Sequence, residues 1–236
     1  ACKSEQVGTL VYTSTPSVVF DRHDLAGADE TLPYASRPLC AYAASKILAE
    51  RAVLAANGTG LKTVAIRPHL VWGPGDTNLI PRLIERGQAG QLAMVGRGNN
   101  MVDITYIDNA VYAHLLAADN LCTSASAAGE AFFIGQEAPV NLWQWINALF
   151  ARLGIATITR QVPLPLAYSA GAALEMIHRL VRPQQEPRMT RFLAQQLAKS
   201  HWFSHAKAER LLGYRPLVNT ASGTDKLIAW LAGLSR

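Results

Sequence analysis

The feature that most constrains this chain is a strand-like segment followed by a helix that carries a tyrosine and a lysine. Thr9–Thr13 predicts a buried strand with hydroxyl side chains at its end. The following helix is predicted to begin near Pro38, a residue suited to a first helical turn, and to end at Asn57. Tyr42 and Lys46 are four residues apart, so their side chains share one face of this helix.

The tyrosine and the lysine form a candidate acid/base pair. A free tyrosine has a pKa near 10, and proton exchange near neutral pH requires a fall of roughly 2–3 units, about 3–4 kcal/mol. One cation about 4 Å away supplies roughly 4 kcal/mol at an effective dielectric constant of about 20. A single lysine is therefore enough to make Tyr42 a general acid/base for a carbonyl/alcohol pair. The same spacing also occurs in helices whose tyrosine simply packs. The surrounding motifs are therefore needed to distinguish a catalytic pair from a packed tyrosine.

Further motifs follow in a fixed order: Thr13–Thr15, the Tyr42 and Lys46 pair, Val64–Asp76 (VAIRPHLVWGPGD) and Asp103–Asn109 (DITYIDN). Together they resemble the extended short-chain dehydrogenase/reductases, also called the NAD-dependent epimerase/dehydratase family. The tail motifs Glu186–Thr190, His201–Phe203 and Leu212–Pro216 narrow the resemblance to the 3β-hydroxysteroid dehydrogenase branch. Within it, the chain is most similar to bacterial sterol-dehydrogenase-like reductases of 2-alkyl-3-oxoalkanoates.

The resemblance implies an α/β fold. It predicts the C-terminal part of a Rossmann-type doubly wound parallel sheet, plus a smaller, mostly helical substrate-binding domain. Residues 1–76, joined again by 103–120, would form the remaining half of the dinucleotide-binding domain. Residues 77–102 and 121–236 would form the substrate-binding part.

The N-terminal glycine-rich part of the family has no counterpart here. In the family a glycine-rich turn after the first strand holds the pyrophosphate, whereas no glycine stretch of this chain opens a helix after an apolar strand. We therefore expect a piece of a longer enzyme that binds dinucleotide weakly and has no turnover alone. The strand at 9–13 would lie at an open sheet edge, which favours self-association.

The resemblance also implies roles for individual residues. Tyr42 would exchange the proton with the substrate oxygen, Lys46 would lower the tyrosine pKa and hold the nicotinamide ribose, and Thr15 would bond the substrate oxygen. Thr13, Ser14 and Ser17 offer alternative hydroxyls. The implied cofactor is NAD or NADP. In the family, the choice between them is set in the N-terminal glycine-rich part, which has no counterpart here. The implied cofactor-binding residues are Thr13, Ser14, Tyr42, Lys46, Pro68 and Val71.

The predicted function is NAD(P)-dependent interconversion of a secondary alcohol and a ketone. The apolar, aromatic region 162–205 suits a hydrophobic small-molecule substrate, either steroid-like or a long-chain 3-oxoacyl compound. A nucleotide-sugar epimerase/dehydratase is the alternative enzyme, although Pro16 and Ser17 follow Thr15 where dehydratases place acidic residues. A non-catalytic binding module that retains the fold is the alternative from another class.

Composition limits the classes of protein to which this chain can belong. Half of the residues are hydrophobic and 17% are charged, as in folded globular chains. The three cysteines form no CxxC, which favours a reducing cytoplasm and argues against a zinc site. His201 and His205 are spaced like metal ligands, but Trp202 replaces the glutamate of the protease motif, so no metal is predicted.

The charge is uneven: residues 160–215 carry nine Lys/Arg against three acids, within a chain of net charge +5. No aromatic-interleaved basic run accompanies them, so nucleic acid is not a predicted partner. An acidic substrate, an anionic membrane surface or an acidic missing half each explains the excess. The apolar run Val162–Leu174 is too short to span a membrane. It predicts a lid over the substrate pocket, an interfacial helix with a peripheral membrane contact, or core packing. A homodimer is predicted instead from the open edge of the strand at 9–13.

The sequence also makes several local predictions. Ser17–Arg37 predicts a loop over the active site, and His69 faces either the pocket or the core. Asp108, Asn141 and Ser204 are predicted to cap the helices that follow them.

Overall fold

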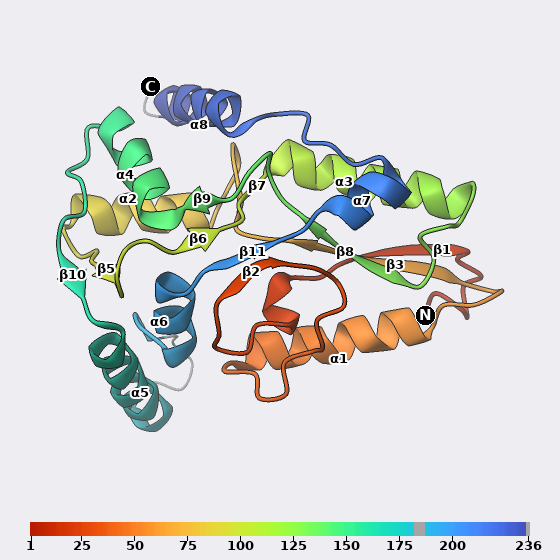
Figure 1. The fold of residues 1–236 in the computed structure, drawn as a ribbon, viewed down its shortest axis with the longest axis horizontal. Helices are drawn as coiled ribbons and strands as arrows, with labels where there is room; N and C mark the ends of the chain where they lie inside the picture. The colour runs from red at the N-terminus through yellow and green to blue at the C-terminus, as the bar shows by residue number, and fades with distance from the viewer. Residues whose placement is uncertain (182–186, 235–236) are drawn as a thin grey trace.

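A parallel three-stranded sheet forms one end of the molecule (Figure 1). The computed structural model describes residues 1–181 and 187–234. The sheet contains β1 (Thr9–Thr13), β3 (Lys62–Pro68) and β8 (Glu130–Ile134) in the order β1-β3-β8. Among the described strands β1 therefore has one neighbour, which confirms the predicted open edge.

Helices cover both faces of this sheet. Figure 1 shows α1 (Ala41–Ala55) on one face and α3 (Ile107–Cys122) on the other. The small side chains of Ala113 and Ala117 on α3 are fully buried against β3 and β8, so the helix approaches the sheet closely. α7 (Ala206–Leu212) closes the same core.

The remaining strands are short and form three small sheets. One sheet has the order β2-β11-β6-β9, and the pairs β4–β7 and β5–β10 form the others. Their bounds are β2 (Leu25–Ala28), β4 (Val71–Trp72), β5 (Met94–Val95), β6 (Met101–Val102), β7 (Thr105–Tyr106), β9 (Val140–Asn141), β10 (Gln161–Val162) and β11 (His201–Phe203).

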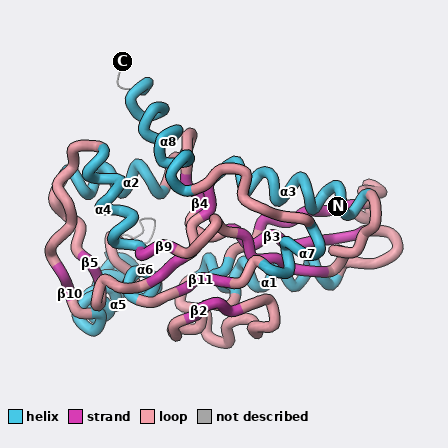
Figure 2. The backbone as a smooth tube through the Cα atoms, turned by 45° about the horizontal axis from the view of Figure 1, so that its top comes forward, coloured by secondary structure: helices cyan, strands magenta, loops and turns pink. Residues whose placement is uncertain are grey.

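A second, mostly helical part carries an aromatic core. Figure 2 shows α2, α4, β5 and β10 at the end of the molecule away from the parallel sheet. Trp72, Trp143, Trp145 and Phe150 are buried there. The helices are α2 (Leu79–Gln88), α4 (Leu142–Arg152), α5 (Leu164–Val181), α6 (Arg191–Ala198) and α8 (Thr220–Leu234).

The proposed domain division remains a prediction, and two strands cross it. β8, from the range assigned to substrate binding, pairs with β3 in the main sheet. β2, from the first range, pairs with β11 in the second part. Parallel pairing brings these distant segments together, and no local pattern in the sequence marks it.

Several local predictions need correction. Pro38 lies before α1, which begins at Ala41 with Cys40 as its N-cap. Asp108 lies in the first turn of α3 and does not cap it, because the strand β7 runs directly into the helix. His205 stands at the N-cap of α7, and the Ser204 hydroxyl instead accepts a 3.4 Å bond from the amide of Ala206.

Two other local predictions had different outcomes. The Asn141 cap is confirmed, since its side-chain oxygen accepts from the amides of Trp143 and Gln144 at 3.1 and 3.0 Å. The predicted loop Ser17–Arg37 also holds regular structure: part of the 3₁₀ turn Pro16–Val18 and the strand β2, which gains its order from pairing with β11.

A glycine sets the close packing of α5 on α6. A Cβ atom added at Gly171 would lie 2.7 Å from the backbone carbonyl carbon of Thr190. We therefore expect Gly171→Ala to lower the free energy of unfolding by about 1–3 kcal/mol, despite the better helix propensity of alanine. Chemical denaturation measures this. The matched control is Gly233→Ala in α8, where an added Cβ meets nothing within 4 Å; equal effects at both positions would contradict the packing argument.

Candidate functional site

The predicted acid/base pair lies beside the end of β1. The Lys46 Nζ atom donates a 2.9 Å hydrogen bond to the carbonyl of Thr13 and lies 6.0 Å from the centroid of the Tyr42 ring. It also lies 5.0 Å from the ring centroid of Tyr12. The Tyr42 side chain is 52% exposed, and its hydroxyl bonds to no residue that the structure describes. The helix thus presents both groups at the carboxyl end of the sheet, where α/β folds bind ligands.

The hydroxyl side chains after β1 differ in their surroundings. The Thr13 hydroxyl is 2.7 Å from His114 Nε2 on α3, whereas the Thr13 carbonyl accepts from Lys46 on α1. Thr13 therefore contacts the helices on both faces of the sheet. Ser14 is buried. Thr15 donates a 3.2 Å bond to the Ser17 hydroxyl and accepts one of 3.2 Å from the Ser17 amide. Thr15 and Ser17 therefore form a coupled pair, and the catalytic role of Thr15 remains a prediction.

One turn further along α1, a buried ion pair anchors the helix to β3. Arg67 donates to both carboxylate oxygens of Glu50, from Nη2 at 2.5 Å and from Nε at 3.1 Å. The Tyr34 hydroxyl donates a 2.8 Å bond to the same carboxylate. Burial disfavours the charged carboxylate, but the bonds and charge of Arg67 outweigh it and lower the pKa of Glu50. Burial and the bond to Glu50 raise the pKa of Tyr34 to about 12. No pattern in the sequence predicts this anchor, because Glu50 on α1 and Arg67 on β3 meet only in the folded chain.

The turn between β3 and β4 carries the other residues that the resemblance assigns to the cofactor. Pro68 is buried at the end of β3, and Val71 is half-buried at the start of β4. Leu70 between them has φ of 41°, a left-handed conformation that a non-glycine residue adopts only when its surroundings impose it. The Thr105 hydroxyl secures the turn, because it accepts from the amide of His69 at 3.2 Å and donates to its carbonyl at 2.9 Å.

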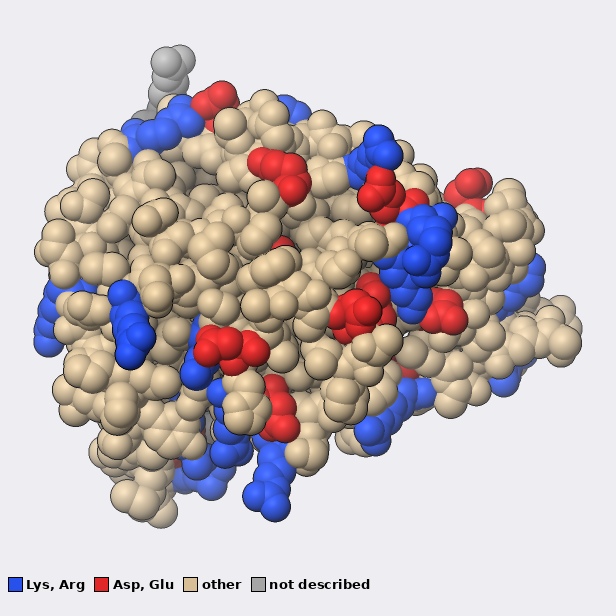
Figure 3. Space-filling view, in the orientation of Figure 1, with Lys and Arg blue, Asp and Glu red and all other residues tan. Residues whose placement is uncertain are grey.

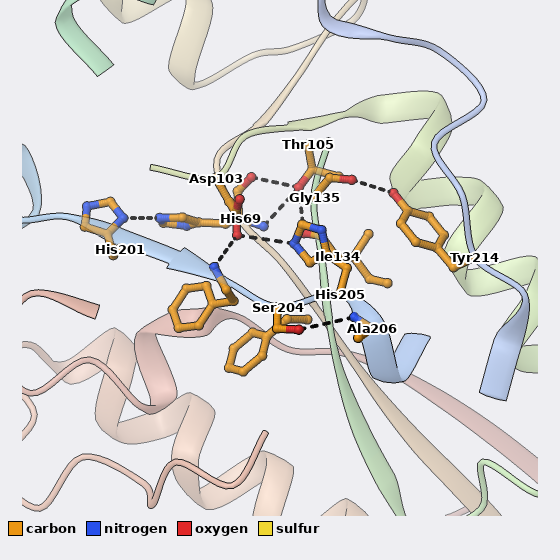
Figure 4. Close-up of polar contacts among 12 residues, drawn as sticks. His69, Asp103, Thr105, Ile134, Gly135, His201, Ser204, His205, Ala206 and Tyr214 are labelled. Atoms are coloured by element: carbon orange, nitrogen blue, oxygen red, sulfur yellow. Dashed lines mark hydrogen bonds and ion pairs between the residues drawn. The ribbon is translucent and has the colours of Figure 1, made fainter. Parts of the chain in front are cut away.

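His69 packs against a second histidine (Figure 4). Its Nε2 lies 2.6 Å from His201 Nδ1, and His201 Nε2 lies 2.8 Å from the carbonyl of Gln196. A carbonyl can only accept, so His201 carries its proton on Nε2, and His69 donates to the free Nδ1. Burial lowers the pKa of His69 well below its usual value, with a further contribution from His201, and burial also lowers the pKa of His201. The pair is therefore neutral at physiological pH.

Asp103 ties the strand ends together beside this pair. Its Oδ2 accepts from the amide of Phe203 at 2.8 Å and lies 3.3 Å from His205 Nε2 (Figure 4). Nearby, the Tyr214 hydroxyl donates a 2.8 Å bond to the carbonyl of Gly135. His201 and His205 thus have separate partners, and no cluster of three potential metal ligands occurs in residues 1–181 and 187–234.

A cleft of 740 Å³ lies in the second part of the molecule. Its lining includes Asn100 and Gln161 on its polar side and Pro163 and Leu164 at the start of α5. Tyr42 and Lys46 do not line it. Ser17, His69 and His201 pack together so closely that no space for a water-sized molecule remains between them.

Comparison with known proteins decides the family. The model of the 3-beta hydroxysteroid dehydrogenase/isomerase family matches residues 1–166. The chain belongs to this family. It is 47% identical to a 2-alkyl-3-oxoalkanoate reductase of Shewanella oneidensis, covering 98% of this chain and 62% of that relative. A second 2-alkyl-3-oxoalkanoate reductase, from Stenotrophomonas maltophilia, is 46% identical, covering 97% of this chain and 70% of that relative.

More distant family members and solved structures extend the comparison. The decarboxylating sterol-4-alpha-carboxylate 3-dehydrogenase of Mus musculus is 36% identical, with 96% of this chain and 64% of that relative covered. The crystal structure of gox2253 superposes with a TM-score of 0.74 at 25% identity, over 99% of this chain and 69% of that one. UDP-glucuronic acid 4-epimerase from Bacillus cereus shares the fold, with a TM-score of 0.67 at 20% identity over 100% and 65% of the two chains. These likenesses confirm the α/β, Rossmann-type fold of this family member.

The 3-beta hydroxysteroid dehydrogenase/isomerase family member described here spans 62–70% of the length of the three relatives named above. Its surroundings at Lys46 fit a dinucleotide. The ammonium group has three N–H donors, of which one serves the Thr13 carbonyl, and it forms no ion pair with a carboxylate of the described residues. Two donors therefore remain for the hydroxyl groups of a ribose.

Proposed function

We propose that this chain contributes the proton-transfer residues of an NAD(P)-dependent oxidoreductase that interconverts a secondary alcohol and a ketone on a hydrophobic substrate. The observation that carries this proposal is the placement of Tyr42 and Lys46 at the carboxyl end of β1, with the lysine bonded to the Thr13 carbonyl. The names of the relatives, reductases of 2-alkyl-3-oxoalkanoates and dehydrogenases of sterol-4-alpha-carboxylates, support a long-chain 3-oxoacyl or steroid-like substrate. The cofactor would be NAD or NADP.

In this proposal the residues of the chain divide the work. The bound dinucleotide supplies or accepts the hydride. Tyr42 transfers its hydroxyl proton to the substrate oxygen in reduction and removes it in oxidation. Lys46 holds a ribose with its two remaining N–H donors, while Thr15, coupled to Ser17, bonds the substrate oxygen. Thr13 and Ser14 at the end of β1, with Pro68 and Val71 in the β3–β4 turn, complete the proposed cofactor contacts.

The test is a Tyr42→Phe variant of the complete natural polypeptide that contains these residues. We expect kcat for ketone reduction to fall at least about a hundredfold, because general acid catalysis contributes 10²–10⁴-fold. Dinucleotide affinity should change little. The assay measures NADH and NADPH oxidation with a 2-alkyl-3-oxoalkanoate and with a 3-oxosteroid.

The matched control is Tyr112→Phe, which changes a tyrosine on α3 instead. Retained activity in Tyr42→Phe with normal dinucleotide affinity would refute the assigned role of Tyr42. Loss of activity in both variants would point to a general structural effect.

Two further aspects of the proposal concern assembly and location. The open edge of β1 supports a homodimer, and the low use of cysteine supports a cytoplasmic enzyme. Within the described part of the chain, no helix has the length and apolar character needed to cross a membrane.

A further inference from the structure

A histidine on α3 reaches the end of β1. The Nε2 atom of His114 lies 2.7 Å from the hydroxyl oxygen of Thr13, which is 101 positions earlier in the chain. The other ring nitrogen, Nδ1, lies 2.7 Å from the carbonyl oxygen of Ala110, one turn back along the helix. A carbonyl can only accept, so His114 carries a proton on Nδ1, and in the neutral ring the Thr13 hydroxyl donates to Nε2. Both ring nitrogens are used, which gives the ring a single orientation.

The same strand end is held from two other sides. The amide of Ser14 donates a 2.7 Å bond to the carbonyl of Ile66 on β3. The carbonyl of Thr13 belongs to the same planar trans peptide unit, so it points away from β3, towards the open edge of the sheet. Lys46 on α1 donates to this carbonyl at 2.9 Å. The elements β3, α1 and α3 thus each hold one group of the strand end.

The bond between His114 and Thr13 lies outside the hydrophobic core. Thr13 is exposed and His114 is half-buried, whereas the fully buried Ala113 and Ala117 pack α3 against the sheet. Water replaces an exposed hydrogen bond at little cost, so this bond contributes little to the free energy of unfolding. Its effect is on orientation instead. It fixes the side chain of Thr13, and in a β-branched residue the side-chain rotamer and the backbone angles are coupled.

The direction of the Lys46 ammonium group matters for a dinucleotide. One of its three N–H donors serves the Thr13 carbonyl, so the position of that carbonyl sets the direction of the two donors left for a ribose. The surface charge around α3 and α7 does not replace these directed donors. Figure 3 shows basic and acidic side chains intermixed there, and Lys207 and Arg215 are paired with carboxylates.

We propose that His114 is a positioning residue for dinucleotide binding, which acts through Thr13 on Lys46. The ring fixes the Thr13 side chain, the Thr13 carbonyl then holds the lysine, and the lysine presents its two remaining donors to the ribose. The inference rests on the proposed function, because it takes the dinucleotide as the ligand of Lys46. It adds to that function a residue from α3, on the face of the sheet opposite the helix of Tyr42 (Figure 1).

His178 on α5 offers a comparison within the same molecule. Its Nδ1 lies 2.9 Å from the carbonyl of Leu174, so it makes the same contact within its helix as His114 makes with Ala110. It is half-buried, as His114 is. Its Nε2 bonds to no residue that the structure describes. The contact with a second element therefore distinguishes His114, and His178 is its matched control.

The test uses the complete natural polypeptide in which Tyr42→Phe is examined, titrated with NADH and NADPH and assayed for ketone reduction. We expect His114→Ala to raise Kd and KM for the dinucleotide about three- to tenfold, the range that one hydrogen bond supports, with kcat within about twofold. His114→Gln, whose amide oxygen can accept from Thr13, should recover most of the affinity. His114→Ala added to Thr13→Val should cause no further loss of affinity, because both changes remove the same bond.

The control His178→Ala should leave the dinucleotide affinity unchanged, and urea denaturation should give both alanine variants the same midpoint. Unchanged affinity in His114→Ala would overturn the inference and leave the proposed function intact. A lower midpoint in His114→Ala, without recovery of affinity in His114→Gln, would assign the ring a structural role and also overturn it. Retained activity in Tyr42→Phe would refute proton transfer by Tyr42 alone. No dinucleotide binding by the unaltered polypeptide would refute both proposals.

A second measurement tests the geometry without a ligand. Nitrogen-15 NMR of the 236-residue chain distinguishes the two tautomers of a neutral imidazole ring, and the signals of His114 are assigned by their absence in His114→Gln. We expect the neutral His114 ring to carry its proton on Nδ1. A proton on Nε2 instead would overturn the inference, because that nitrogen could not then accept from Thr13.

Discussion

Glu50→Gln should lower the free energy of unfolding by about 3–5 kcal/mol. The carboxylate of Glu50 is fully buried, and Arg67 is 4% exposed. The variant keeps the size of the side chain but leaves the guanidinium of Arg67 buried without its counter-charge. The ring of Phe133, whose centroid lies 5.0 Å from the guanidinium, offers only partial compensation. Urea denaturation followed by circular dichroism measures the change.

Two further variants separate the buried charge from the loss of a contact. The double variant Glu50→Leu with Arg67→Met removes both charges and should recover most of the stability, because a buried pair gains little over apolar residues of similar volume. Glu209→Gln removes one partner of the exposed pair with Arg215 and should leave the midpoint unchanged within error. Equal losses in Glu50→Gln and Glu209→Gln would contradict the argument from burial.

The paired histidines should make the protein sensitive to mild acid. The pKa values of His69 and His201 lie below their unfolded value of 6.5, chiefly because both rings are buried. The unfolded chain therefore takes up protons first, and stability present above pH 6.5 is lost as the pH falls towards the folded pKa values. We expect the free energy of unfolding to decrease by about 2–4 kcal/mol between pH 7 and pH 5.

The slope of the free energy of unfolding against pH shows whether the histidines cause this loss of stability. Glu50 also has a lowered pKa, but its contribution is lost only below its ordinary value of 4.5, outside this window. The carboxylates of Asp103 and Asp24 act in the opposite direction on His201, raising its pKa against the effect of burial. His201→Gln should flatten the pH dependence by about 1.4 kcal/mol per pH unit, one proton's contribution. His23→Gln, at an exposed position, is the control; an unchanged slope in His201→Gln would exclude this assignment.

The sequence by itself determined the elements whose signals are local. The strand Thr9–Thr13 has the predicted bounds. The helix with Tyr42 and Lys46 follows it in the chain and precedes β3. Asn141 caps α4 because its side chain reaches amides only two and three residues away. Four-residue spacing on a helix likewise placed Tyr42 and Lys46 on one side, since that geometry depends on the backbone alone.

Only the tertiary structure decided which distant groups meet. The carboxylate of Glu50 finds Arg67 across 17 positions, and His69 finds His201 across 132. Parallel pairing of β2 with β11 likewise joins residues that no local pattern connects. Burial, which shifts the pKa values of Glu50 and of both histidines, depends on how the layers pack. The outer side of α5, where Leu166 and Leu180 are exposed, follows the same rule, because a helix of this composition is buried or uncovered according to what the rest of the chain places against it.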